Sequence, residues 1–279
     1  MTKILLNLVD SFGFFLLNSA MLQFYTQLKK ELITLGKQGI VFLVLIAIVL
    51  SFTDNSSTAV RFFSFGLITW LYVLKICHSK LSLNYDSDSG TQFHDLGFGN
   101  RVTLLRGLLI SATAGFLGSN QSTVSEFALF SPAVFYTVAA IGDALDGYIA
   151  RVTNQTSHLG RELDNALDAL GLLIAPTLAV LWGKLEVWYL GASISYYIFR
   201  LGVFLRTQAN LPVYPLPPNP FRRRIAGYQM GIVATSLWAP VPAELTRPIG
   251  TLLMVPLLVR FILDWLHVSG HFRNPKEQT

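Results

Sequence analysis

Charged residues are scarce in this chain of 279 residues. They make up 13% of the sequence, whereas a soluble domain usually carries about 25%. Apolar residues make up 52% and are grouped in long runs, and residues 39–52 contain no charge. Runs of this kind recur along the chain, which argues against a large soluble domain. The pattern predicts an all-α integral membrane protein with several spans.

Cysteine is almost absent as well. Cys77 is the single cysteine, which excludes an intramolecular disulfide and a metal site built from several cysteines. The net charge of +5 is explained by Lys and Arg gathering in loops on one side of a membrane, so no nucleic-acid partner is expected. Asn7 and Asp10 interrupt the first apolar stretch, which favours a retained helix over a cleaved signal peptide.

Breaks in the apolar pattern divide the chain into four parts. These are predicted to be accessory N-terminal membrane helices (1–77), a polar linker (78–99), a membrane core (100–270) and a C-terminal tail (271–279).

The accessory part is predicted to contain three helices. Residues 4–27 form either a membrane-surface helix or a weak span, and a charged connector from Lys29 to Lys37 follows. Residues 38–54 and 59–76 are predicted to form a helical hairpin around a polar turn.

The core is predicted to contain six transmembrane helices. Their expected ranges are 101–118, 127–148, 160–182, 185–206, 224–242 and 247–268.

The distribution of Lys and Arg predicts the orientation of these helices. If Asn100 faces the cytoplasm, the connectors on that side carry most of the basic residues. The connectors on the other side carry only Lys184 and Arg247. This is the asymmetry expected of cytoplasmic loops. It places Asn100 and the loops 149–160 and 207–223 at the cytoplasmic face.

Four aspartates are predicted to meet inside the core. Asp143 and Asp146 are three residues apart near the end of the second core helix, and Asp164 and Asp168 are four residues apart near the start of the third. Each pair therefore shares a helix face. Each buried acid costs roughly 2.5–3.5 kcal/mol on membrane-insertion scales. Four hard oxygen donors would offset this cost by binding two Mg²⁺ or Mn²⁺ ions, which could clamp a phosphoryl group.

The residues between the two pairs fit the same chemistry. Gly147 and Ala150 are small and leave room for a ligand, Arg151 can bind phosphate oxygens, and Gly160 keeps the next helix face open. The competing interpretation is a set of ordinary salt bridges, with Arg151 and Arg161 as partners of the acids.

These residues form one continuous pattern, DxxDGxxARx₈GxxxDxxxD, between positions 143 and 168. The pattern resembles the signature of the CDP-alcohol phosphotransferase (CDP-alcohol phosphatidyltransferase) family at every fixed position. The resemblance implies a six-helix membrane core, usually homodimeric, with its site at the cytoplasmic membrane surface. It also implies transfer of a substituted phosphate group from a CDP-linked lipid donor, such as CDP-diacylglycerol, to an alcohol acceptor in phospholipid biosynthesis, with release of CMP.

The same resemblance implies roles for individual residues. Asp143, Asp146 and Asp164 would bind metal, and Asp168 would bind metal and act as the general base. The motif residues Gly147, Ala150 and Arg151 would hold the CDP group.

The start of the first core helix resembles a second family pattern, Pro-Asn-x-x-Thr-x-x-Arg. Asn100, Thr103 and Arg106 match it, and Gly99 replaces the proline. The resemblance implies that these residues lie near the nucleotide. Asn100 is also a good helix cap, which is the competing interpretation.

Three further arginines are candidates for substrate binding. Arg200 interrupts an apolar helix and is expected to face the bundle interior, with a phosphate or an aspartate as its partner, unless it reaches the membrane interface. Arg223 and Arg224 would line a phosphate or acceptor pocket, or simply anchor the topology.

The histidines carry weaker signals. Asp264, His267 and His271 have metal-like spacing, but the pattern is typical of an interfacial surface. His158 is expected to be a solvated loop residue.

Two other functions remain open from the residues alone. An intramembrane prenyltransferase also uses aspartate-bound Mg²⁺, and a cation transporter also uses buried acids. The acceptor is open too: the residues after the last glycine of the motif lack the pattern expected for glycerol 3-phosphate and have only a faint similarity to serine-transferring relatives.

Overall fold

The computed structural model describes residues 2–86, 89–152, 156–216 and 220–271. Within these ranges it describes the backbone alone for residues 2–24, 144, 146–151 and 220–223. These residues form helices α1 (Thr2–Thr53), α2 (Ser56–Ser79), α3 (Gly97–Ala114), α4 (Glu126–Val152), α5 (His158–Leu181), α6 (Leu190–Gln208), α7 (Pro220–Leu237) and α8 (Ala243–Val268). Short 3₁₀ helices lie at Leu81–Leu83, Gly115–Gly118 and Val187–Tyr189. The predicted all-α fold is confirmed.

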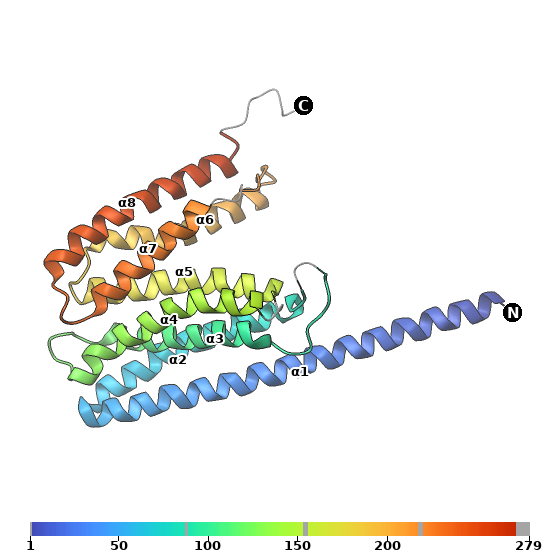
Figure 1. The fold of residues 1–279 in the computed structure, drawn as a ribbon, viewed down its shortest axis with the longest axis horizontal. Coiled ribbons are helices and arrows are strands. Elements are labelled where there is room, and N and C mark those ends of the chain that lie inside the picture. The colour runs from blue at the N-terminus through green and yellow to red at the C-terminus, as the bar shows by residue number, and fades with distance from the viewer. Residues whose placement is uncertain (1, 87–88, 153–155, 217–219, 272–279) are drawn as a thin grey trace.

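The helices form three groups, which are the α1–α2 hairpin, α3 to α5, and α6 to α8 (Figure 1). The α1–α2 hairpin packs on α3, which also packs on α4 and α5. Helices α6, α7 and α8 lie on the other side, where α5 contacts both α6 and α7. Because consecutive helices alternate in direction, the start of α3, the end of α4 and the start of α5 lie at one end of the bundle.

Five of the described helices are long and apolar enough to cross a membrane: α1 from Tyr25, α2, α3 with the 3₁₀ turn after it, α5 and α8. Their burial inside the protein differs widely. The most apolar window of α3 is 67% buried, whereas that of α8 is 17% buried. Helix α3 is therefore an inner helix, whereas the rest of the described chain leaves most of the surface of α8 uncovered. The chain is a multi-pass integral membrane protein.

A stripe of small residues brings α2 against α3. Gly107 and Ser111 on α3 and Gly115 at the start of the 3₁₀ helix after it repeat every fourth residue. A Cβ on Gly115 would lie 2.3 Å from the Phe62 ring of α2, and one on Gly107 would lie 2.8 Å from Val73 Cγ1. Such stripes let the backbones of membrane helices approach closely. The hairpin is thus fitted to the core rather than loosely attached to it.

Helix α1 differs from the prediction. The expected connector between Lys29 and Lys37 is helical, and the backbone runs without a break from Thr2 to Thr53. Lys29, Lys30 and Lys37 are exposed, so these residues remain solvated on the surface of a helix. Charged residues with long side chains are good helix formers, and their presence did not require a break.

The polar segment after α2 is also more ordered than a linker. Lys80 pairs with Glu162 of α5, and the Tyr85 ring lies 4.6 Å from the His158 ring. Glu31 of α1 accepts a hydrogen bond from the backbone of Leu96 at 3.1 Å. The segment therefore ties α1, α2 and the start of α5 together at one end of the bundle.

A polar contact fixes the opposite end. Asp54, between α1 and α2, accepts hydrogen bonds from the backbone N–H and the hydroxyl of Ser125 at 2.7 and 2.6 Å. Ser125 in turn accepts a hydrogen bond from the backbone of Ala128 in the first turn of α4. Burial alone would raise the pKa of Asp54, but the hydrogen bonds from Ser125 and Thr53 outweigh it and hold the pKa below its usual value.

Candidate active site

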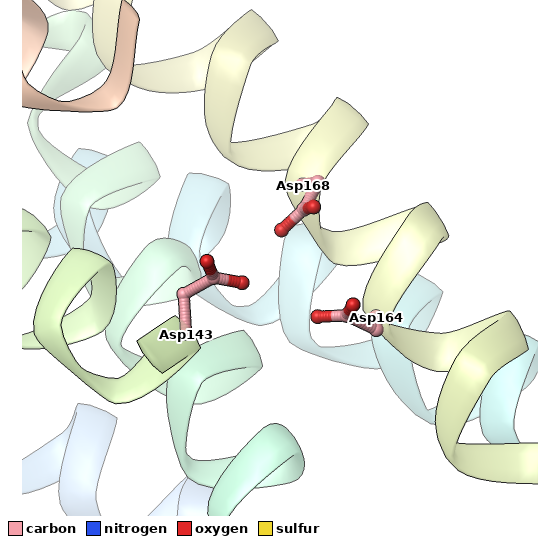
Figure 2. Close-up of side chains that lie close together, drawn as sticks. All are labelled: Asp143, Asp164 and Asp168. Atoms are coloured by element: carbon pink, nitrogen blue, oxygen red, sulfur yellow. The ribbon is translucent and has the colours of Figure 1, made fainter. Parts of the chain in front are cut away.

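Three of the four predicted aspartates meet between α4 and α5. One carboxylate oxygen from each of Asp143, Asp164 and Asp168 lies within 4.8 Å of the others. Figure 2 shows Asp143 pointing from its helix toward the two acids of the other. Asp164 and Asp168 lie one turn apart on the same face of α5, whose first turn is capped by Ser157 Oγ, which accepts a hydrogen bond from the N–H of Gly160 at 2.9 Å. The spacing in the sequence thus becomes a cluster in space.

Arg106 of α3 joins all three carboxylates. Its Nη2 atom lies 2.7 Å from Asp143 Oδ1 and 2.8 Å from Asp168 Oδ1, and its Nη1 atom lies 2.8 Å from Asp164 Oδ1. The Arg106 side chain is only 3% exposed, whereas the three carboxylate side chains are 26–39% exposed. The guanidinium thus lies on the protein side of the cluster and the carboxylates toward its open side.

Gly142 makes room for this arginine. A Cβ on Gly142 would lie 2.8 Å from Arg106 Cγ and 3.2 Å from Arg106 Cδ. Because the guanidinium is held by three carboxylates, the stem of Arg106 has little freedom to move aside. Gly142, directly before Asp143, therefore allows α3 and α4 to present the arginine and the acid to each other.

A second polar group lies between the starts of α3 and α5. Asn100 is buried, and its Nδ2 donates to Ser157 Oγ at 3.1 Å and to Asn84 Oδ1 at 3.3 Å. A Cβ on Gly160 would lie 2.6 Å from Asn100 Oδ1. Gly160 therefore provides space for Asn100, rather than simply an open helix face.

The comparisons with known proteins agree with this geometry. The family model for CDP-alcohol phosphatidyltransferases matches residues 97–271, which include Arg106 and all four aspartates. The chain belongs to the CDP-alcohol phosphatidyltransferase family. It is also 30% identical over 115 residues, 40% of its length, to the CDP-diacylglycerol--serine O-phosphatidyltransferase of Helicobacter pylori (strain ATCC 700392 / 26695). The matched stretch spans 48% of that relative. No solved structure matches the chain.

The other candidates of the second family pattern lie on α3. Asn100 is inside α3, which begins at Gly97 with Leu96 in the capping position, so the interpretation of Asn100 as a helix cap is wrong. Thr103 is buried and its hydroxyl donates to Gly99 O at 3.0 Å. Arg106 lies one turn further along and reaches the acids.

The salt-bridge interpretation named Arg151 and Arg161 but not Arg106, which pairs with the three described acids. Arg161 is exposed and its guanidinium contacts the His158 ring at 2.8 Å. The predictions for Asp146, Gly147, Ala150, Arg151 and Arg223 fall on positions whose side chains are outside the described residues.

Two of the arginines predicted to bind substrate are exposed and are not part of the carboxylate cluster. Arg200 is exposed on α6 and does not face the bundle interior as expected, and its electrostatic neighbour is Glu162. Arg224 is exposed near the start of α7.

The C-terminal acid is not a surface residue, contrary to the prediction. Asp264 is 6% exposed and lies 2.5 Å from Nη2 of Arg260, one turn earlier on α8. His271 Nδ1 lies 2.8 Å from Ser269 Oγ. Within the part of the chain that the structure describes, one group of acids, histidines or cysteines lies close enough together to hold a metal ion, and that group is Asp143, Asp164 and Asp168.

Tyr136 is a neighbour of the cluster that sequence reasoning missed. It lies on α4, two turns before Asp143, and is 2% exposed. Its hydroxyl has electrostatic neighbours in Tyr189, Asp168, Arg106 and Asp143, and no hydrogen-bond partner among the described residues. The i, i+7 spacing from Asp143 is the signal that could have found it, because residues two turns apart share a helix face.

Proposed function

We propose that this protein transfers a phosphatidyl group from CDP-diacylglycerol, or a related CDP-linked lipid, to an alcohol and releases CMP. The observation that carries the proposal is the meeting of Asp143, Asp164 and Asp168 from two helices inside the region matched by the family model. The family match also favours this function over a prenyltransferase or a cation transporter. The active unit is proposed to be the membrane core, residues 100–270, with its site at the cytoplasmic face.

The carboxylate cluster fits a divalent cation. Its donors are hard oxygens within 4.8 Å of one another, and their side chains are partly exposed. Such donors suit Mg²⁺ or Mn²⁺. We propose that Asp143, Asp146, Asp164 and Asp168 hold two ions. When bound, the ions would neutralise the charge that develops on the phosphates and on the leaving CMP.

The acceptor hydroxyl is proposed to lose its proton to Asp168. Its oxygen forms a bond to the phosphorus that carries the diacylglycerol, while the bond between that phosphorus and the bridging oxygen to CMP breaks. Asp168 lies one turn further along α5 than Asp164, on the same helix face. We propose that these two side chains lie on one side of the reacting phosphate.

Serine is the acceptor that we propose to test first. The similarity to a serine-transferring enzyme of Helicobacter pylori supports it. Inositol phosphate, glycerol 3-phosphate and water belong in the same screen as competing acceptors. A homodimer, as implied by the family resemblance, stays a prediction.

The decisive experiment is CMP release by the purified protein from CDP-diacylglycerol, with each acceptor and with Mg²⁺ or Mn²⁺. Asp164→Asn should abolish release by weakening metal binding. Glu162→Gln is a matched control, because Glu162 lies two residues earlier on α5 and contacts Lys80 instead of the cluster. Release that continues in EDTA, or that survives Asp164→Asn, would contradict the proposal.

A further inference from the structure

Arg106 occupies the centre of the carboxylate cluster. Its guanidinium binds one oxygen of each of Asp143, Asp164 and Asp168 at 2.7–2.8 Å. These three oxygens come from two helices, and the arginine comes from a third. Arg106 is thus the positive charge that links α3 with α4 and α5 at the site.

Two positive groups would compete for these oxygens. An oxygen that binds Mg²⁺ lies about 2.0–2.1 Å from the ion. A guanidinium that shares the same three carboxylates would then lie within a few ångströms of a doubly charged ion, where repulsion between like charges is strong. The carboxylates can satisfy the arginine or the ion fully, but not both in the present arrangement.

We propose that Arg106 is an internal counter-ion that competes with divalent cations for the carboxylates, and that it turns toward the diphosphate of the CDP-linked donor when the ions bind. The proposal rests on the proposed function, which supplies the ions and the donor. A buried guanidinium that loses its carboxylates needs another anion. The donor diphosphate is the anion that the reaction brings to this position, and guanidinium binds phosphate in bidentate fashion.

The arrangement has two consequences. Without metal, Arg106 offsets the repulsion among the three carboxylates and stabilises the site. With metal but without donor, the same charge opposes the ions, so metal binding is weaker than the carboxylates alone would give. Metal and donor should therefore bind cooperatively through Arg106.

Arg106→Gln tests the competition directly. Mn²⁺ binding to the purified protein without donor, measured by calorimetry or by electron paramagnetic resonance, should become about tenfold tighter or more, since one opposing charge is gone. Adding CDP-diacylglycerol should tighten Mn²⁺ binding in the wild type and much less in the variant. Arg101→Gln is the matched control on the same helix: Arg101 pairs with Glu31 at 2.7 Å, away from the cluster, and its loss should change neither result.

Thermal unfolding provides a second measurement that does not depend on activity. In EDTA, Arg106→Gln should unfold at a lower temperature than the wild type, because three carboxylates lose their partner. In saturating Mn²⁺ this gap should close or reverse, whereas any gap for Arg101→Gln should be the same in both conditions. A gap that Mn²⁺ leaves unchanged, or weaker Mn²⁺ binding by Arg106→Gln, would show that Arg106 is only structural.

A variant that does not fold is also informative. Arg106→Lys keeps the charge but replaces the planar guanidinium fork by a compact ammonium group, so its Mn²⁺ affinity should lie between those of the wild type and Arg106→Gln. If both variants fold only when Mn²⁺ is present during purification, the counter-ion role is supported. If neither folds with or without Mn²⁺, the competition is refuted. Mn²⁺ binding without CMP release would count against the proposed function alone.

Discussion

Gly160→Ala provides a sharp test of how the start of α5 is held. A Cβ at this position would lie 2.6 Å from Asn100 Oδ1 and 3.2 Å from Ser157 Oγ. Asn100 is buried and is held by Ser157 and Asn84, so it can move aside only by breaking these hydrogen bonds. The methyl group should therefore destabilise the contact between α3, the segment before it and α5.

The expected magnitude follows from the contacts. Two neutral hydrogen bonds, at about 0.5–1.5 kcal/mol each, give a loss of about 1–3 kcal/mol. Replacing glycine by alanine in a helix returns about 1 kcal/mol. The net destabilisation should be about 0–2 kcal/mol, measured by thermal unfolding in detergent.

Two comparisons decide whether the clash is the cause. Gly231→Ala is the matched control, since Gly231 lies within α7 and its Cβ would have no neighbour within 4 Å. It should leave stability unchanged or slightly raise it. In an Asn100→Ala background, Gly160→Ala should no longer destabilise the protein. An equal loss in both backgrounds would refute the reasoning.

Three further predictions concern other parts of the chain. Tyr136→Phe should stabilise the metal-free protein by about 1 kcal/mol, because it removes a buried hydroxyl that has no hydrogen-bond partner among the described residues; a loss in thermal unfolding would show that the hydroxyl is bonded in solution. Because the pKa of Asp54 is lowered in the fold, its ionised carboxylate stabilises the protein above the unfolded pKa of about 3.9, and this stabilisation is lost as pH falls through the folded pKa. Asp54→Asn should therefore weaken the dependence of the unfolding temperature on pH below about pH 4, and an unchanged dependence would contradict this. In a protein without Cys77, an impermeant thiol reagent added to sealed cells should label Ser122→Cys and miss Gln155→Cys; the reverse pattern would overturn the proposed orientation.

The helices of the core could be predicted from the sequence because their signals are local. Apolar runs and polar breaks predicted a helix at each of α3 to α8, of which α3, α5 and α8 are long and apolar enough to cross a membrane. The four-residue spacing of Asp164 and Asp168 placed them on one face. The continuity of α1 was missed because exposed lysines on a helix resemble a charged loop when only composition is considered.

The centre of the site could not be predicted in the same way. Arg106 is 58 and 62 residues from Asp164 and Asp168, and no local pattern pairs residues so far apart. The family resemblance drew attention to Arg106 for the nucleotide, whereas its contacts are with the acids. No sequence pattern singles out Gly142 either, because the space that it leaves for Arg106 matters only once α3 packs against α4.

The close fit of the α1–α2 hairpin to α3 has a consequence for how this protein can be divided. The family model begins at residue 97, yet the side chains that fill the grooves at Gly107 and Gly115 come from Val73 and Phe62, upstream of that boundary. Excising the hairpin would open two furrows along the inner helix that also carries Arg106. The region matched by the family model is therefore smaller than the set of helices that pack together here, and α3 connects the side chains of α2 to the arginine that holds the carboxylates.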